Sequence, residues 1–287
     1  MEGRTDCDMG TTEKQVLNNV LCPVCRRDTD LIWSDKNYFA RKCKKCHVIF
    51  SSTNTFVKYD EKYFSTWYIK PYFKRKRYFE KLLKKIENCI EIPCGKLLDA
   101  GCGTGIFLEI AKKHSFDVCG IETSLFAVQY CKERGFDVIC CDIKKSDFPD
   151  NYFDVVTMFD VIAHLENPLG YLNHIRKLLK NEGIIIIKTP YHPLLLFKIA
   201  QLLGFTGMSK GLLHIPAQIF HFTPLSLKNL LSFAGFDTMC ILKVNEMPSF
   251  FLSFSPKTMA SFFVQLILKI IYGADSVVII GKKVQPA

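Results

Sequence analysis

The stretch KLLDAGCGTG at residues 96–105 decides the fold of this 287-residue chain. A short apolar run ends in an acid, three glycines follow at alternate positions, and residues 106–111 continue with the apolar spacing of a helix. A strand, a glycine-rich turn and a helix in this order open an α/β nucleotide-binding domain. The stretch therefore predicts a parallel sheet that binds its ligand at the carboxyl edge of the strands.

The same stretch favours S-adenosylmethionine over a dinucleotide. The dinucleotide fingerprint needs a glycine or alanine three residues after the second glycine, where this chain has Ile106. The carboxylate of Asp99 would repel a pyrophosphate, but it suits a ligand that carries an ammonium and a sulfonium and no phosphate. The glycines then let the backbone approach the methionine moiety closely.

Four further apolar runs predict the rest of the parallel sheet, and the first three end in Glu122, Asp142 and Asp160. An acid after the second strand of such a sheet can bind both ribose hydroxyls. An acid after the third strand can accept a hydrogen bond from the adenine amino group while Ile143 packs on the ring. A helix cap or loop role is the alternative for any one acid, but not for the set. The runs cover residues 117–121, 138–141, 153–159 and 183–188.

Three segments carry a resemblance to the class I S-adenosylmethionine-dependent methyltransferases: LDAGCGTG at 98–105, CDI at 141–143 and FDVVTMFDVIAHLENP at 153–168. From about Phe56 onward the chain is most similar to ubiquinone-biosynthesis O-methyltransferases and methyltransferases of polysaccharide gene clusters. The resemblance implies an α/β fold with a Rossmann-like seven-stranded sheet, helices on both faces, and an antiparallel pair at 238–242 and 277–280. The implied cofactor-binding residues are Asp99, Gly101, Cys102, Gly103, Gly105, Glu122, Thr123, Asp142, Ile143 and Phe159.

Two histidines are candidates for the general base. Methyl transfer is an in-line displacement by a lone pair, and a hydroxyl acceptor must also lose a proton. His164, four residues after Asp160, stands where the family pattern has a histidine following the fourth strand. Its alternative role is to pack against the loop or to hydrogen-bond it. His221, in FHFTP at 220–224, precedes a helix capped by Thr223. The predicted catalytic residues are His164, Asp160 and His221.

Two C-x₂-C pairs near the N-terminus predict a zinc ribbon. Cys22 and Cys25 form the first pair, Cys43 and Cys46 form the second, and seventeen residues lie between the pairs. Two such turns complete a tetrahedron of thiolates around zinc, and four thiolates leave no position for water. The predicted zinc is therefore structural. Four unrelated buried cysteines are the alternative.

The chain divides into four predicted regions: a disordered N-terminus at 1–18, the zinc ribbon at 19–54, a connector at 55–93, and the methyltransferase domain at 94–287 with an insertion at 190–222. The connector is rich in aromatic and basic residues, and its latter part has helical spacing. Its aromatic residues predict either ordinary packing or a lid that closes over the cofactor and the substrate cavity.

Charge and apolar content leave the partner open. The net charge is +10, and a basic stripe at 70–85 could meet nucleic acid, an anionic membrane or a phosphorylated substrate, or could be a solvated helix face. The amphipathic stretches at 190–222 and 262–271 favour core and lid packing over membrane contact. The absence of an export signal predicts a cytoplasmic protein with reduced thiols, and peripheral contact with the inner face of the membrane is left open.

The best-supported function is O-methylation of a small-molecule or lipid-linked saccharide acceptor. An RNA methyltransferase, ribosomal or transfer RNA specific, is the alternative suggested by the charge and the ribbon. Against it, the chain reads Phe159-Asp160-Val161-Ile162 where a base-amine methyltransferase carries an Asn-Pro-Pro-Tyr-like motif. A non-catalytic module in which the ribbon recruits a partner is the third hypothesis, and the intact cofactor set argues against it.

Overall fold

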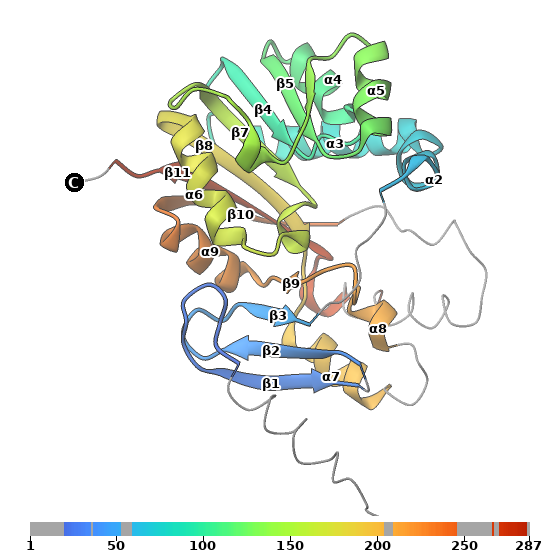
Figure 1. Cartoon of the computed structure of the whole chain (residues 1–287), viewed down its shortest axis with the longest axis vertical. Coiled ribbons are helices and arrows are strands. Elements are labelled where there is room, and N and C mark those ends of the chain that lie inside the picture. Colours follow the sequence, from blue (N-terminus) through green and yellow to red (C-terminus); the bar gives the residue numbers. More distant parts are fainter. Residues whose placement is uncertain are drawn as a thin grey trace, which may run out of the picture.

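The computed structural model describes residues 20–285 except for 36, 53–58, 204–208, 246–265 and 267–269. The N-terminal region predicted to be disordered and most of the stretch 262–271 lie outside the described residues. Two sheets form the framework: a seven-stranded sheet of order β10-β11-β8-β7-β4-β5-β6 and a four-stranded sheet of order β1-β2-β3-β9 (Figure 1).

The seven-stranded sheet is the predicted one. The five strands from β8 to the β6 edge run parallel, and β10 and β11 at the other edge form the predicted antiparallel pair. The strand order reverses between β4 and β7, which creates the crevice where such sheets bind ligands. The strands are β4 (Lys96–Ala100), β5 (Asp117–Glu122), β6 (Val138–Cys140), β7 (Phe153–Phe159), β8 (Leu179–Pro190), β10 (Phe236–Val244) and β11 (Ser276–Lys283).

Helices cover both faces of this sheet because side chains on a strand alternate between faces. Along β11, Val277 and Ile279 pack with α6 (Pro168–Leu178) and α9 (Pro224–Phe233). Their neighbours Val278 and Ile280 pack on the other face with α3 (Tyr72–Glu87) and α4 (Ile106–Lys113). A further helix, α5 (Leu125–Glu133), packs beside α4.

The region predicted to be a ribbon forms a small sheet, but this sheet does not stand apart from the rest of the chain. Its strands β1 (Thr29–Ser34), β2 (Phe39–Cys43) and β3 (Ile49–Ser51) are joined by β9 (Phe220–His221), which comes from the predicted insertion. Two helices of the insertion, α7 (Leu194–Leu202) and α8 (Ser209–Leu212), lie beside this sheet (Figure 1). The ribbon and the insertion also share one core, made of Trp33, Ala40, Ile49, Leu196, Phe197, Ala200, Leu212, Leu213 and Ile215.

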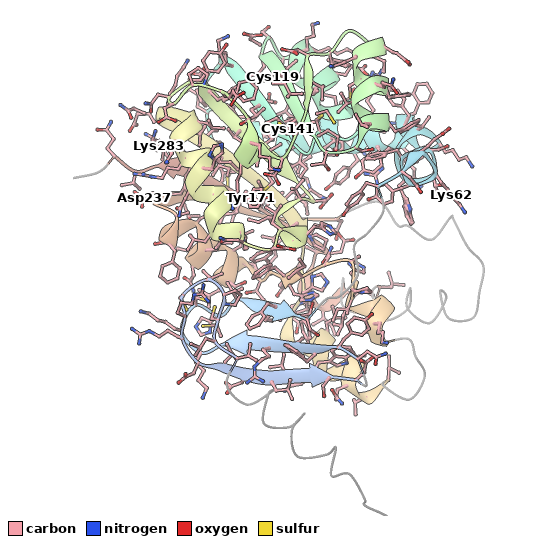
Figure 2. The ribbon with its side chains drawn as sticks, in the orientation of Figure 1. Lys62, Cys119, Cys141, Tyr171, Asp237 and Lys283 are labelled. Atoms are coloured by element: carbon pink, nitrogen blue, oxygen red, sulfur yellow. A yellow bond between two sulfur atoms is a disulfide. The ribbon has the colours of Figure 1, made fainter. Side chains whose placement is uncertain are left out.

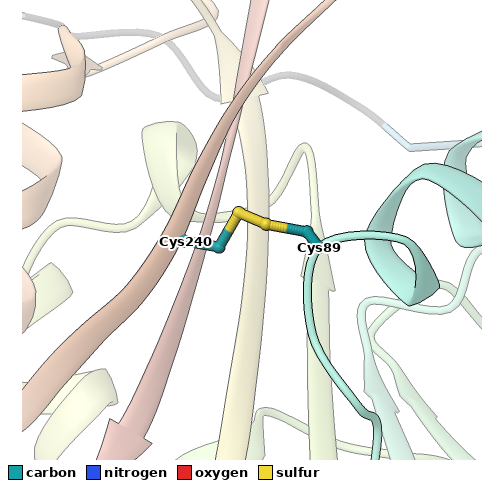
Figure 3. The surroundings of a disulfide bond; sticks show 2 residues. All are labelled: Cys89 and Cys240. Atoms are coloured by element: carbon teal, nitrogen blue, oxygen red, sulfur yellow. A yellow bond between two sulfur atoms is a disulfide. The ribbon is translucent and has the colours of Figure 1, made fainter.

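One pair of cysteines departs from the expectation of reduced thiols. A disulfide joins Cys89, just after α3, to Cys240 on β10 (Figure 3). The two Cα atoms are 6.7 Å apart although 151 residues separate the cysteines in the sequence. The expectation is wrong for this pair because only the folded sheet brings the two residues together. The ten other cysteines in the described part of the chain are free thiols.

In the parts of the chain that the structure describes, no helix combines the length and the apolar character needed to cross a membrane.

Candidate active site

A cavity of about 680 Å³ lies at the carboxyl edge of the parallel strands. Tyr171 on α6 and Cys141, both labelled in Figure 2, are part of its wall. The wall also contains most of the residues that the sequence predicted for the site. These are Gly101, Gly103, Glu122, Thr123, Asp142, Ile143, Phe159, Asp160 and His164.

The glycine loop forms the floor of the cavity beside β4. Gly101 and Gly103 have φ angles of 81° and 54°, a region that residues with a side chain rarely adopt. The backbone N–H groups of Gly101 and Cys102 donate to the carbonyl of Ile121 at 2.7 and 3.1 Å, which holds the loop against β5. Cys102 and Gly105 are not part of the wall: Cys102 packs with α5, and Gly105 precedes α4.

Asp99 lies behind the glycine loop and is almost completely buried, with 3% of its surface exposed. Its carboxylate accepts a hydrogen bond from the Thr157 hydroxyl at 2.7 Å, and it takes part in no ion pair among the described residues. Burial raises the pKa of Asp99 to about 7, and the nearby charge of Glu122 adds to this rise. A buried acid in this state suits a ligand that brings a positive charge.

The acids that end β5 and β6 are held in fixed positions. Glu122 accepts from the backbone N–H of Gly103 at 2.9 Å through one oxygen and from Thr123 and Ser124 at 2.7 and 3.0 Å through the other. Asp142 accepts from the Lys144 backbone N–H at 2.8 Å and from the Tyr171 hydroxyl. Both carboxylates therefore lie in the cavity wall with their positions set by these hydrogen bonds.

Asp160 follows β7 and is paired with a lysine that the sequence analysis missed. The ammonium of Lys188, which is 1% exposed, lies 2.7 and 2.8 Å from the two Asp160 oxygens. Burial lowers the pKa of Lys188, and the charge of Asp160 opposes that shift. Asp160 has a φ of 60°, and its N–H donates to the Lys188 carbonyl at 2.8 Å. A lysine at the end of the apolar run 183–188 was the signal that could have revealed this pair.

His164 faces the cavity from the short helix η3 (Ile162–His164) that follows β7. Its Nδ1 lies 2.6 Å from the carbonyl oxygen of Ala217. A carbonyl only accepts, so Nδ1 carries the proton and Nε2 keeps its lone pair. Burial lowers the pKa of His164, which keeps the imidazole neutral. A neutral imidazole with one fixed tautomer has the properties of a general base.

The structure does not bring His221 to this cavity. His221 is fully buried on β9, where its Nε2 lies 3.2 Å from the Ser51 hydroxyl and its ring lies 4.9 Å from that of His192. Burial lowers the pKa of His221 to about 3. The side chain lies in the contact between the ribbon and the insertion. His221 is 57 residues beyond His164 in the sequence, and no local pattern indicates this contact.

Aromatic residues of the connector cover the cavity on one side. Tyr59, α2 (Glu61–Phe64) and the π-helix η1 (Ser65–Ile69) contribute rings, and Phe64 stacks on Phe126 of α5 with ring centroids 6.3 Å apart. The wall residues from this segment are Tyr59, Tyr63, Phe64, Trp67 and Tyr68.

The basic stripe of α3 is divided between the cavity and the surface. Arg75 lines the cavity, lies 4.1 Å above the Tyr68 ring and donates to the Trp67 carbonyl. Among the described residues no carboxylate forms an ion pair with it. Its neighbours Lys74, Arg77 and Lys81 are exposed on the opposite face of the helix. The sequence analysis did not separate Arg75 from these residues.

The insertion supplies the wall opposite the aromatic segment. His214, Ile215, Pro216, Ala217 and Gln218 all line the cavity. The side-chain oxygen of Gln218 is buried and has no hydrogen-bond partner in the described structure. A buried polar atom of this kind requires a partner, so this wall can bind a polar group of a ligand.

The four ribbon cysteines form a separate cluster that fits a metal. All four sulfur atoms lie within 4.8 Å of one another, with Cys22 and Cys46 at 3.5 Å and Cys25 and Cys43 at 3.4 Å. Sulfurs bonded to zinc at about 2.3 Å in a tetrahedron would be roughly 3.8 Å apart. The backbone N–H groups of Lys45 and Cys46 point at the Cys43 sulfur at 3.4 Å, as they do toward a thiolate.

Comparison with known proteins supports the interpretation of the cavity. The family model described as a methyltransferase domain matches residues 59–241. An uncharacterised protein of Methanocaldococcus jannaschii is 32% identical over 170 residues, which span 59% of this chain and 66% of that protein.

Two enzymes match over shorter segments. Phosphoethanolamine N-methyltransferase 3 of Arabidopsis thaliana is 31% identical over 102 residues, which span 33% of this chain and 21% of that enzyme. The ubiquinone biosynthesis O-methyltransferase of Actinobacillus pleuropneumoniae is 30% identical over 105 residues, which span 33% of this chain and 45% of that enzyme. These matches cover less than two thirds of the relatives' own lengths.

A solved structure has the same fold. The crystal structure of a SAM-dependent methyltransferase from Archaeoglobus fulgidus superimposes with a TM-score of 0.52 at 22% identity, covering 72% of this chain and 94% of that one. The glycine loop, the buried acid behind it and the acids at the strand ends agree with the family match over 59–241. The chain therefore belongs to the S-adenosylmethionine-dependent methyltransferases.

Proposed function

We propose that this enzyme methylates a hydroxyl oxygen of a small-molecule or lipid-linked saccharide acceptor, with His164 as the general base. The observation that carries the proposal is the hydrogen bond from His164 Nδ1 to the Ala217 carbonyl. It leaves a neutral Nε2 as the proton acceptor in a cavity whose wall also contains Glu122 and Asp142.

The cofactor side of the cavity has a group for each part of S-adenosylmethionine. The bound cofactor supplies a methyl group on a sulfonium. Asp99 and the glycine loop suit the methionine ammonium, Glu122 the ribose hydroxyls, and Asp142 with Ile143 the adenine. Arg75 suits the methionine carboxylate, because it stacks on Tyr68, whose ring lies 3.5 Å from the position that a Cβ would take on Gly103.

The acceptor side suits a hydroxyl rather than a charged group. Tyr59, Tyr63 and Trp67 give it largely apolar walls, which exclude water from the transfer path. Both oxygens of Asp160 are already paired with the Lys188 ammonium. His164 is then the group best able to take the proton of an acceptor hydroxyl as its oxygen attacks the methyl group.

For the ribbon we propose a structural zinc ion held by Cys22, Cys25, Cys43 and Cys46. The sulfur separations and the N–H groups directed at Cys43 support this choice. Metal analysis of carefully purified protein should return one zinc per chain, and Cys46→Ser should lose it. Wild-type protein that is folded and free of metal would contradict the proposal.

The function is tested with methyl-labelled S-adenosylmethionine, supplied with separate fractions of small metabolites, glycolipids and total RNA. We expect label on an oxygen of a metabolite or glycolipid, located by fragmentation in a mass spectrometer. His164→Ala should abolish this labelling, while the control His114→Ala, on an exposed histidine that is not part of the cavity wall, should not. Label on a nitrogen or carbon atom, or on RNA alone, would overturn the proposed acceptor.

A further inference from the structure

The last strand of the ribbon is hydrogen-bonded directly to the insertion. The backbone N–H of Ser51 on β3 donates to the carbonyl of Ile219 at 2.8 Å, and the Ser51 hydroxyl donates to the carbonyl of Gln218 at 3.1 Å. In the same pairing, Ile49 lies opposite His221 and Phe50 opposite Phe220. The ribbon therefore fixes residues 218–221, which form the end of the cavity wall and the strand that follows it.

That segment also holds His164. The N–H of Ile219 donates to the carbonyl of Ala163 at 2.8 Å, next to His164 in the chain. Two residues earlier, the Ala217 carbonyl accepts the Nδ1 proton of His164. Ser51 and His164 thus contact neighbouring peptide groups of residues 217–219.

Two of the four cysteines of the proposed metal site lie just before β3 in the chain. The knuckle 43–46 joins β2 to β3, and the N–H of Cys43 donates to the carbonyl of Val48 at 2.9 Å. The Asn229 side chain of α9 donates to the carbonyl of Cys46 at 3.1 Å, so the knuckle is also tied to the catalytic domain. A metal that closes the knuckle fixes the position from which β3 reaches β9.

We infer that the zinc ribbon is a positioning module for the active site: through β3 and residues 217–219 it fixes the tautomer of His164 and the acceptor wall, and it leaves the cofactor side unaffected. This inference rests on the proposed role of His164. Without the ribbon, the Ala217 carbonyl is no longer held against Nδ1. His164 then exchanges between tautomers, and the form with a protonated Nε2 cannot accept a proton from the acceptor.

The sharpest test is Ser51→Pro in the full chain, with Ser51→Ala as the matched control. Since the Ser51 N–H donates to Ile219, proline removes a hydrogen bond from the β3–β9 edge and leaves the four cysteines unchanged. Alanine removes only the hydroxyl contacts. The zinc content, the affinity for S-adenosylhomocysteine and the ring-nitrogen NMR shifts of ¹⁵N-labelled histidines are measured. The His164 signals are assigned from a His164→Gln spectrum.

We expect Ser51→Pro to keep its zinc and to bind S-adenosylhomocysteine within about twofold of wild type. The same variant should lose the single Nδ1–H form of His164, with methyl transfer slowed by ~10-fold or more, since small displacements of a catalytic group have large effects on rate. Ser51→Ala should retain the wild-type tautomer.

Treatment of the wild-type chain with a zinc chelator should give the same loss of tautomer with cofactor affinity retained, which provides a second route if the proline variant does not fold. A His164 that keeps its Nδ1–H form after both treatments would overturn the inference. The NMR result does not depend on turnover. If His164→Ala proved fully active, the proposed base would fail while the structural coupling could still be tested.

Discussion

The two sides of the cavity are built in different ways. The side of the cavity that we assign to the cofactor comes mainly from one continuous stretch, residues 99–143, to which α3 adds Arg75. In that stretch β4, β5 and β6 each end in an acid or a glycine turn at the same edge of the sheet. The side that we assign to the acceptor is assembled from three segments: the aromatic segment 59–68, the turn at 160–165 and the insertion residues 214–218. The ribbon contacts the insertion through the pairing of β3 with β9.

The two sides also differ in the hydrogen bonds that hold their residues in place. On the side that we assign to the cofactor, Glu122 and Asp142 are held mostly by backbone N–H groups no more than two residues away or in the adjacent glycine loop, and the Tyr171 hydroxyl adds a more distant contact to Asp142. On the acceptor side, the His164 ring depends on a carbonyl 53 residues further along the chain. We therefore expect changes on the acceptor side to leave cofactor binding nearly intact.

The largest effect should come from His164→Ala. Removal of a general base lowers turnover by about 10²–10⁴-fold. The affinity for S-adenosylhomocysteine should stay within about threefold of wild type, well below the ~1.4 kcal/mol that a tenfold change represents. Turnover with a purified acceptor and calorimetry with S-adenosylhomocysteine measure the two effects. If the affinity fell as far as the turnover, the two sides would not be separable.

On the cofactor side, Asp99→Ala should weaken binding of S-adenosylhomocysteine by ~100-fold, roughly 3 kcal/mol, because the ligand ammonium loses its charged partner. Gly103→Val should be as damaging, since a branched side chain at a φ of 54° strains the loop and fills space that the ligand needs. Thr157→Val, which removes only the hydroxyl that donates to Asp99, is the control. Calorimetry that finds wild-type affinity in both damaging variants would end this assignment.

The protonation of Asp99 should make cofactor binding depend on pH. Its pKa of about 7 in the free protein means that the carboxyl is protonated below that pH and ionised above it. The ligand ammonium binds the ionised form, so affinity for S-adenosylhomocysteine should be constant above about pH 8 and fall by up to ~10-fold per pH unit below pH 7. Calorimetry from pH 5.5 to about 8.5 measures this. An unchanged slope in Asp99→Asn would assign the dependence to another group.

The smallest effect is expected at the exposed face of α3. Combined replacement of Lys74, Arg77 and Lys81 by glutamine should change turnover and cofactor affinity by less than about twofold. These side chains are exposed on the face of α3 opposite Arg75, where salt screens their charges. Raising the salt from about 50 to 200 mM should likewise have little effect. Filter-binding with structured RNA provides the opposing outcome. Tight binding with a steep salt dependence, lost in the triple variant, would favour an RNA acceptor.

Local sequence patterns predicted the two sides of the cavity to different extents. The strand–turn pattern of residues 96–105 and the acids at 122, 142 and 160 are local signals. They predicted the sheet and acids in the cavity wall, whereas the role of these acids toward the cofactor stays a prediction. The cap at Thr223 was equally local and is confirmed. The four-cysteine cluster was predicted from spacing alone.

The remaining features depend on tertiary contacts. No pattern within the ribbon indicates that β9 will complete its sheet, and none within the insertion indicates that Ala217 will meet His164. Arg75 faces the cavity because it lies four residues before Phe79, on the face of α3 that is buried. A charge count over 70–85 does not show this. His221 was selected for its residue type, whereas its burial beside Ser51 follows from the sheet.

The pairing of β3 with β9 also has a consequence for synthesis. Ser51 and His221 are 170 residues apart, so a ribosome that adds about 5–20 residues per second emits the ribbon roughly 10–30 s before its fourth strand. During that interval β3 exposes unpaired backbone groups, and an open strand edge can pair with another chain. The ribbon is therefore synthesised well before its sheet can be completed, and until then its open edge is a site for unwanted pairing.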